Sequence, residues 1–167
     1  MEQKHHDANE PVGFRRHDHT ACVRDTLQRA EAICREKKLR LTPVRRRALE
    51  ILLAEHRALG AYDLLAVLAD EGLGNQPPVA YRALDFLVSA GFAHKIEALN
   101  AYIGCTHLGE GHNPVFLICR ACKSVAETCT GPEQGRLGAA ARAAGFRIER
   151  TVLEAEGLCP DCQGVPA

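Results

Sequence analysis

Apolar residues recur every three or four positions in the first half of the chain, which is the spacing of amphipathic helices. The first predicted helix covers roughly Ala21 to Lys38. A second should begin at Thr42-Pro43, because threonine is a common helix N-cap and proline fits the first helical position. A third is predicted over Ala61–Glu71 and a fourth from Pro77-Pro78 to near Gly91. The residues expected to face the core are Leu27, Ala30, Ile33, Cys34, Val44, Ala48, Ile51, Leu52, Ala61, Leu64, Leu65, Leu68, Ala80, Leu84, Leu87 and Val88.

The hydrophobic period changes after the fourth helix. Phe92–Ala98 and Ala101–Cys105 have strand character and flank Leu99-Asn100, so they predict a short β-hairpin. Helices followed by such a hairpin are typical of a winged helix-turn-helix, a DNA-binding fold. We therefore expect a winged-helix domain at residues 21–105, preceded by a flexible arm at residues 1–20.

The second half of the chain has a different order of elements. Val115–Cys119 and Ser124–Cys129 are predicted strands, Pro132–Ala144 is a predicted helix, and Phe146–Glu154 is a predicted third strand. This β-β-α-β order predicts a small α/β domain at residues 114–167, joined to the first by a hinge at residues 106–113. The predicted fold class of the whole chain is α+β.

The composition is that of an ordinary water-soluble protein, with 46% hydrophobic and 25% charged residues. The chain has no run of about 18 apolar residues, so the sequence predicts no membrane span. The polar first 20 residues lack the apolar stretch of a secretion signal, so we expect a cytoplasmic protein. A formal net charge of zero argues against DNA binding through bulk charge, but Arg35–Glu50 holds seven basic residues and two acidic ones.

Two Cys-x-x-Cys pairs, Cys119/Cys122 and Cys159/Cys162, are the strongest chemical signal in the chain. Two such pairs can enclose a zinc ion completely, which leaves no open position for chemistry and indicates a structural site. The alternative is a pair of redox dithiols or ordinary buried cysteines. Eight cysteines in a chain that is not expected to be secreted favour metal over disulfides.

The remaining candidate ligands are weaker signals. A solvated arm explains the N-terminal histidines better than a metal site does. Three further cysteines are more typical of small core residues than of ligands. These residues are His5, His6, His17 and His19 in the arm, and Cys22, Cys34 and Cys129 elsewhere.

The fourth helix carries the predicted DNA-reading surface, because recognition helices place their N-terminal residues in the major groove. Arg82 lies opposite the apolar face and could bind guanine or phosphate. Tyr81 lies at the edge of that face and could contact a phosphate or belong to the core. Tyr62, at the start of the third helix, is placed to contact the DNA backbone or a base. Arg45, in a run of three arginines, could neutralise phosphates or form a solvated face.

Six segments carry the motifs of a known family: Arg40–Arg45, Ala61–Leu65, Pro77–Leu87, Gly91–Lys95, Phe116–Cys122 and Gly157–Cys162. Together they resemble the ferric uptake regulator superfamily and, within it, the zinc uptake regulators. The resemblance covers about residues 24–162. The chain departs from the family pattern Thr-Val-Tyr-Arg, because it has Val79-Ala80-Tyr81-Arg82. Valine can neither cap a helix nor donate a hydroxyl to phosphate.

This resemblance implies a homodimeric transcriptional repressor that binds operator DNA when it is loaded with zinc and controls zinc uptake genes. It implies that the C-terminal domain dimerises and that each subunit binds two zinc ions. One ion would be structural, at the four paired cysteines. The other would be a regulatory ion near the hinge, held by His94, Cys105, His112 and Glu127.

The donor types of this regulatory set favour zinc. One thiolate, two imidazoles and one carboxylate form a tetrahedral, borderline-soft set, whereas an iron sensor would more often use oxygen-rich six-coordinate surroundings. An iron- or other divalent-metal-responsive regulator is the alternative. Taken alone, His94 could be a surface residue and Glu127 a solvated strand charge, and His107 is a possible extra or substitute ligand.

Other classes of protein fit the sequence less well. A zinc deaminase would need a His-x-Glu motif upstream of Pro-Cys-x-x-Cys, and the chain has neither. A dithiol oxidoreductase would need a metal-free Cys-x-x-Cys pair, and a zinc-stapled scaffold that binds only protein stays open. The sequence predicts no catalytic residues, no small-molecule substrate and no membrane partner.

Overall fold

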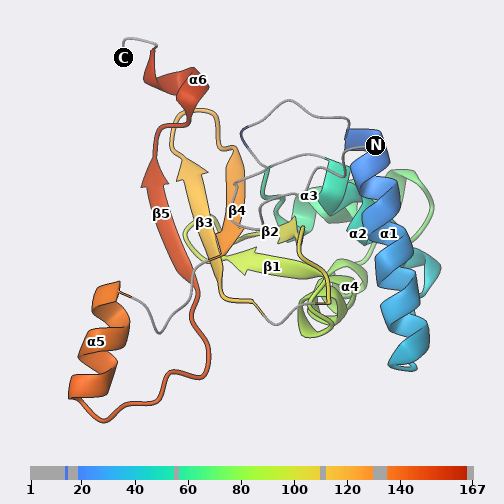
Figure 1. The fold of residues 1–167 in the computed structure, drawn as a ribbon. Coiled ribbons are helices and arrows are strands. Elements are labelled where there is room, and N and C mark those ends of the chain that lie inside the picture. The colour runs from blue at the N-terminus through green and yellow to red at the C-terminus, as the bar shows by residue number, and fades with distance from the viewer. Residues whose placement is uncertain (1–13, 15–18, 55–56, 110–111, 130–134, 165–167) are drawn as a thin grey trace, which may run out of the picture. The chain divides into compact units, whose positions relative to one another are not determined.

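The protein is described from a computed structural model, which covers residue 14 and residues 19–54, 57–109, 112–129 and 135–164. The chain divides into two compact units, with the boundary between residues 110 and 111 (Figure 1). We call them the N-terminal unit and the C-terminal unit and describe each by itself. The arm histidines His5, His6 and His17 lie outside the described residues.

The N-terminal unit has four helices followed by a β-hairpin. Its elements are α1 (His19–Glu36), α2 (Pro43–Ala54), α3 (Ala61–Asp70), α4 (Pro77–Ser89), β1 (Ala93–Ile96) and β2 (Ala101–Gly104). The two strands are antiparallel, with His94 opposite Ile103. Leu59 adds an isolated bridge to the hairpin through two backbone hydrogen bonds with Tyr102, of 2.8 and 2.9 Å. The predicted helices and hairpin of a winged helix-turn-helix are present.

The helix ends follow from local sequence. Thr42 caps α2, because its hydroxyl accepts the N–H of Arg45 at 3.4 Å. The N-cap of α4 is Gln76, and Val79 is the third residue of the helix. A valine in place of threonine at position 79 therefore removes no helix cap. The Val79 side chain instead fills the space beside Gly74, where an added Cβ would lie 3.0 Å from both of its methyl groups.

The N-terminal unit is held by an apolar core between its helices. The fully buried large residues include Leu49, Leu52, Leu64, Leu68, Leu84, Leu87, Phe92, Ile96 and Leu108. Burying one such side chain stabilises the fold by about 1.5–3 kcal/mol. The predicted helix faces are confirmed, although the flanks of the stripes are only partly buried. These partly buried positions are Ile33, Val44, Ile51, Ala61, Leu65 and Val88.

The C-terminal unit contains a three-stranded sheet. Its elements are β3 (Pro114–Cys119), β4 (Val125–Cys129), α5 (Gly135–Ala143), β5 (Leu153–Gly157) and the short α6 (Pro160–Gln163). The strand order is β4-β3-β5, with β4 antiparallel and β5 parallel to β3. The sheet thus connects β3 to the segment that follows β5.

The predicted strand Phe146–Glu154 is wrong in position. The observed strand β5 shares only Leu153 and Glu154 with it and continues to Gly157. Pairing with β3 sets this register, because Val115 lies opposite Leu153 and Cys119 opposite Gly157. The alternation of apolar and polar residues before β5 does not indicate a buried face of the sheet, since Phe146 is 67% exposed. The helix α6 was not predicted.

The predicted helix over residues 132–144 is present as α5 from Gly135, and residues 132–134 lie outside the described residues. Among the helices described, none is both long enough and apolar enough to cross a membrane.

Truncation of Leu84 should weaken the N-terminal unit. Leu84 is fully buried on α4, so Leu84→Ala should lower the free energy of unfolding by about 2–5 kcal/mol. Leu65→Ala, at a half-buried position on α3, is the control and should cost clearly less. Urea unfolding followed by helical circular dichroism measures both. Equal losses for the two variants would contradict the proposed position of the core.

Candidate metal centres and nucleic-acid face

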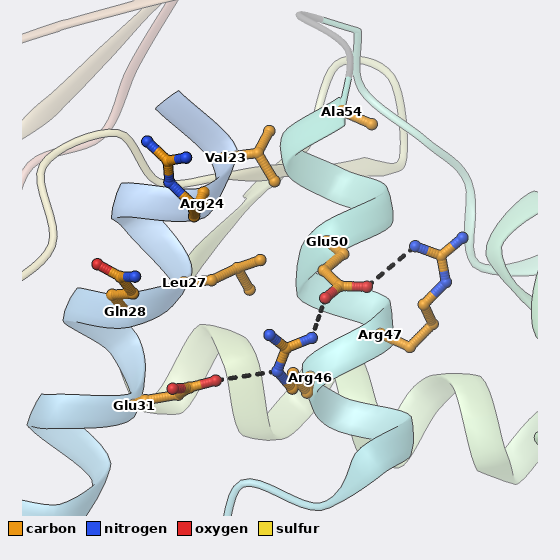
Figure 2. Close-up of a pocket in the computed structure, with 9 residues that line it drawn as sticks. All are labelled: Val23, Arg24, Leu27, Gln28, Glu31, Arg46, Arg47, Glu50 and Ala54. Carbon is orange, nitrogen blue, oxygen red and sulfur yellow. Dashed lines mark hydrogen bonds and ion pairs between the residues drawn. The ribbon is translucent and has the colours of Figure 1, made fainter. Parts of the chain in front are cut away.

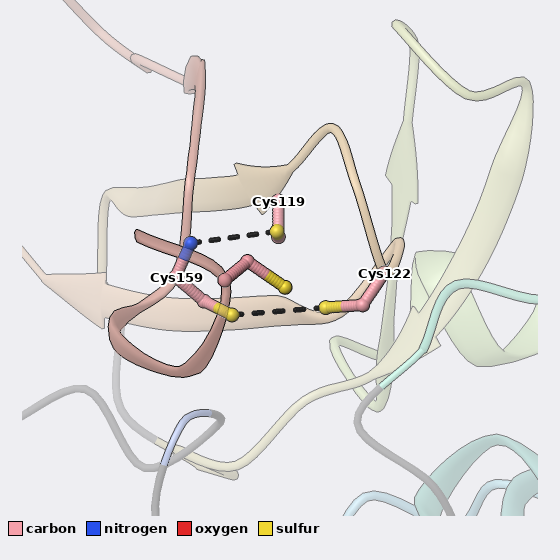
Figure 3. A group of neighbouring side chains, drawn as sticks. Cys119, Cys122 and Cys159 are labelled. Carbon is pink, nitrogen blue, oxygen red and sulfur yellow. Dashed lines mark hydrogen bonds between the residues drawn. The ribbon is translucent and has the colours of Figure 1, made fainter. Parts of the chain in front are cut away.

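Four cysteine side chains converge in the C-terminal unit, and we call this group the cysteine centre. It comprises Cys119, Cys122, Cys159 and Cys162, whose Sγ atoms all lie within 4.8 Å of one another. Figure 3 shows three of these side chains gathered between the end of β3 and the start of α6. The parallel pairing of β5 with β3 brings the two sequence-distant pairs together.

The turn between β3 and β4 shapes the first pair. The N–H of Lys123 donates to the carbonyl of Cys119 at 2.9 Å, and Lys123 adopts a left-handed φ of +63°. This conformation is uncommon for a residue other than glycine, so the turn holds Lys123 in a backbone conformation that lysine seldom adopts. At the second pair, Cys159 is the N-cap of α6, and Pro160 occupies its first turn.

Two hydrogen-bonding groups other than thiols reach the sulfurs. The N–H of Cys159 donates to Cys119 Sγ at 3.4 Å. The Ser124 hydroxyl oxygen lies 2.6 Å from Cys122 Sγ, where it can donate to a thiolate. Donors of this kind orient metal ligands and adjust their basicity. The spacing of the cysteines did not predict a role for Ser124, and only its position two residues after Cys122 could have suggested one.

The cysteine thiols titrate unequally because they lie so close together. The backbone N–H groups of Cys122 and Cys159 lower the pKa of Cys119 to about 6. The neighbouring Cys159 side chain, together with burial, raises the pKa of Cys162 to about 12. Burial also raises the pKa of Cys159. Several thiolates can therefore coexist here only with a compensating positive charge.

The donor geometry of the cysteine centre fits zinc. Zinc–sulfur bonds of about 2.3 Å place tetrahedral sulfurs about 3.8 Å apart. Cys122 Sγ and Cys159 Sγ lie 3.7 Å apart. Four sulfurs form a closed set without an open position, which is the donor arrangement of structural zinc.

Two of the predicted regulatory ligands belong to the N-terminal unit. His94 is half-buried on β1, and Cys105 is fully buried directly after β2. Their ligand atoms lie within 4.8 Å of each other. The segment after Cys105 is fixed, because Arg29 donates to the carbonyl of buried Leu108 at 3.0 Å. His107, the possible substitute ligand, donates its backbone N–H to Cys105 Sγ at 3.4 Å.

The other two predicted ligands belong to the C-terminal unit. His112 Nε2 and Glu127 Oε1 lie 2.8 Å apart, and the Glu127 side chain is only 3% exposed. Glu127 lies opposite Phe116 in the sheet, so the sheet holds its position. A buried carboxylate is costly unless a cation or a hydrogen-bond donor satisfies it. Glu127 is therefore not the solvated strand charge that the sequence left open, and it has the environment of a ligand or of a buried ion pair.

The predicted nucleic-acid face is exposed. Tyr62 at the start of α3 is 67% exposed, and Tyr81 on α4 is 42% exposed. Tyr81 is thus a surface residue, not part of the core. Arg82, next to it, is also exposed. These three side chains are free of the core and can meet a ligand from solvent.

The arginine run on α2 is largely engaged within the unit. Arg46 forms ion pairs with Glu31 of α1 and with Glu50, as Figure 2 shows at a groove of about 580 Å³. Arg47 forms ion pairs with Glu50 and with Glu71, and these carboxylates raise its pKa. Arg46 and Arg47 therefore join α1, α2 and the end of α3, and they do not form a simple solvated face.

No family model matches the chain. Two relatives, both zinc uptake regulation proteins, come from Escherichia coli (strain K12) and Shigella flexneri. Each is 38% identical over 147 residues, which is 87% of this chain and 85% of the relative.

Solved structures give the same result. A zinc uptake regulator complexed with zinc and DNA matches 84% of this chain and 95% of its own, at 37% identity and a TM-score of 0.78. The holo form of XcZur covers 84% of this chain and 99% of its own, at 37% identity and a TM-score of 0.74. The Helicobacter pylori ferric uptake regulator shares the fold at 16% identity and a TM-score of 0.56.

Removal of the Ser124 hydroxyl should loosen the cysteine centre. In Ser124→Ala the hydrogen bond to Cys122 Sγ is lost, so zinc transfer to a competing chelator should become roughly tenfold faster. A colorimetric zinc chelator measures this rate. Ser124→Thr keeps a hydroxyl and serves as the control, with a rate near that of the wild type. An unchanged rate in Ser124→Ala would show that the hydroxyl does not act on the metal ligands.

Proposed function

Because the chain belongs to the zinc uptake regulator family, we propose that it is a zinc-responsive transcriptional repressor that binds operator DNA when zinc-loaded. One observation carries the proposal. A winged helix and a convergent four-cysteine centre occur in a single chain that matches, over most of its length, a regulator complexed with zinc and DNA. The genes it controls would be those of zinc uptake.

The cysteine centre is the structural zinc site in this proposal. Bound zinc would supply two positive charges that allow the four thiols to ionise together. Cys119 and Cys122 would hold the end of β3 and the following turn, while Cys159 and Cys162 would hold α6. The four residues would thus keep the C-terminal end of the chain against the sheet, and no open position is left for catalysis.

The regulatory site is proposed at His94, Cys105, His112 and Glu127. The first two ligands lie in the N-terminal unit and the last two in the C-terminal unit. Ligands divided in this way would restrict the angle between the units when they share an ion, and only some angles suit two DNA half-sites. Cys105 and the imidazoles favour zinc over ferrous iron. With this second site, each subunit would bind two zinc ions.

DNA binding is proposed to use α4 in the major groove. Arg82 would reach a guanine edge or a phosphate, and Tyr62 and Tyr81 would contact the backbone or bases. Their exposure supports this role. Arg45 was also predicted to contact DNA, and its environment supports the more specific role argued below.

The partners are operator DNA and a second copy of the chain. A homodimer, formed through the C-terminal unit, would present two recognition helices to two half-sites about 34 Å apart. The protein would act in the cytoplasm, where DNA is accessible and thiols stay reduced. Its role would be regulatory and not enzymatic.

The proposed function is tested by DNA binding in metal-buffered solution. Fluorescence anisotropy of a labelled duplex from a zinc uptake promoter is measured as free zinc rises, and the titration is repeated with anaerobic ferrous iron. We expect tight binding that appears over a narrow range of free zinc. A response to iron alone would assign the chain to iron sensing, and indifference to both metals would contradict metal-responsive DNA binding.

Replacement of Cys105 should separate sensing from folding. Cys105→Ser removes one thiolate from the regulatory set and leaves the cysteine centre intact. The free zinc needed for half-maximal DNA binding should rise by roughly 5- to 150-fold, the range of typical allosteric couplings. Cys34→Ser, at a buried cysteine outside both sets, is the matched control and should respond to zinc like the wild type. Wild-type zinc dependence in Cys105→Ser would remove this residue from the site.

A further inference from the structure

One side chain, Arg45, joins two elements of the N-terminal unit. These are the recognition helix α4 and the residues 37–40 between α1 and α2, which we call the basic turn. We propose that Arg45 is a positioning residue, which holds the basic turn and α4 together so that both can meet DNA at once. This inference rests on the proposed function, and it assigns Arg45 a role other than direct phosphate neutralisation.

The guanidinium of Arg45 has two partners in the N-terminal unit. Its Cζ lies 3.9 Å from the centroid of the Phe86 ring, which is a cation–π contact. Its Nη1 donates to the carbonyl oxygen of Arg40 at 2.7 Å. The side chain is half-buried. Arg45 is therefore attached at once to α4, through Phe86, and to the basic turn, through Arg40.

The Phe86 contact acts on the recognition helix one turn after Arg82, in the C-terminal half of the helix. Phe86 follows Arg82 by four residues, so the two side chains lie on neighbouring positions of one helix face. Phe86 also packs edge-on against Phe92, with ring centroids 6.4 Å apart. Phe92 directly precedes β1. The Arg45 guanidinium thus packs on a ring that links α4 to the start of the hairpin.

The basic turn presents cations on a defined backbone. Lys37, Lys38 and Arg40 are all exposed. The N–H of Leu39 donates to the carbonyl of Cys34 at 2.8 Å, and Lys38 has a left-handed φ of +54°. Phosphate contacts set the register of a protein on DNA, so the position of these cations relative to α4 decides whether both can be used together.

Arg45 differs in this respect from the two arginines that follow it. Arg46 and Arg47 pair with carboxylates of Glu31, Glu50 and Glu71. Arg45 instead contacts an aromatic face of α4, the proposed recognition helix, and a backbone carbonyl of the basic turn. Stacking on Phe86 uses the planar guanidinium, a shape that lysine lacks.

The test compares four variants on two DNA duplexes: Arg45→Gln, Arg45→Lys, Phe86→Leu and the double variant Arg45→Gln with Phe86→Leu. One duplex is recovered from a random-sequence library by selection with the zinc-loaded wild type, and the other is a scrambled sequence of the same composition. Affinity is measured at several salt concentrations and well below each melting temperature. Phe86→Tyr, which keeps the ring, is the control.

We expect Arg45→Gln and Phe86→Leu each to lose affinity for the selected duplex by roughly tenfold. The double variant should lose little more than either single variant, because both remove the same contact. Arg45→Lys should behave like Arg45→Gln, whereas Phe86→Tyr should bind like the wild type. Arg45→Gln and Phe86→Leu should change the salt dependence by the same amount, since both act by displacing the cations of the basic turn. Binding to the scrambled duplex should change less than binding to the selected duplex.

Three results would overturn this role and leave the proposed function standing. A phosphate contact would lower the salt slope of Arg45→Gln by about 0.9, spare Arg45→Lys and leave Phe86→Leu silent. A purely structural contact would lower melting temperatures without changing the affinity ratio between the two duplexes. Additive losses of DNA affinity in the double variant would show that Arg45 and Phe86 act independently. Failure of the wild type to bind any DNA with zinc would overturn the proposed function, and this role with it.

Discussion

The convergence of four sulfurs within 4.8 Å is the constraint on which the C-terminal unit depends. The unit has a small sheet whose buried apolar residues include Phe116, Ile118, Val125 and Ala126, and its strand β5 is largely exposed. Parallel pairing places Gly157 opposite Cys119, and the chain then needs only two more residues to reach Cys159. The sheet thus brings the thiols together, and a metal held by them would stabilise the sheet in return. A unit of this size commonly needs such a link.

The N-terminal unit is stabilised in a different way. Its apolar core joins all four helices, and ion pairs of Arg46 and Arg47 also tie α1 and the end of α3 to α2. The exposed face of α4 is left for another molecule. In the proposed function, zinc at the regulatory ligands would change DNA affinity while the core of the N-terminal unit stays folded. Such regulation requires that zinc bind one conformation of the chain more tightly than another. Zinc ligands divided between the two units would provide this difference in affinity.

Local signals in the sequence predicted most of the elements and the cysteine centre. Helix periods, the Thr42 cap and the Cys-x-x-Cys spacing all depend on residues close together in the chain, and the structure agrees with each. The prediction of the position of β5 was wrong, because pairing with β3 sets the register of this strand and the alternation around Phe146 does not. The proposed roles of Ser124 and Arg45 were not predicted either. Ser124 lies two residues after Cys122, but the Cys-x-x-Cys spacing does not indicate a hydrogen bond between them, and Arg45 depends on the Phe86 ring, which is distant in the chain.

We propose that one chain holds a structural zinc centre and a separate sensing centre. X-ray absorption at the zinc edge tests this division most directly, on protein loaded with one and then two equivalents of zinc. The first equivalent should have four sulfur neighbours. The second equivalent should add nitrogen and oxygen neighbours, since its ligands would be two imidazoles, a carboxylate and the Cys105 thiolate. A first ion with mixed ligands, or a chain that binds only one zinc ion, would contradict the division into two centres.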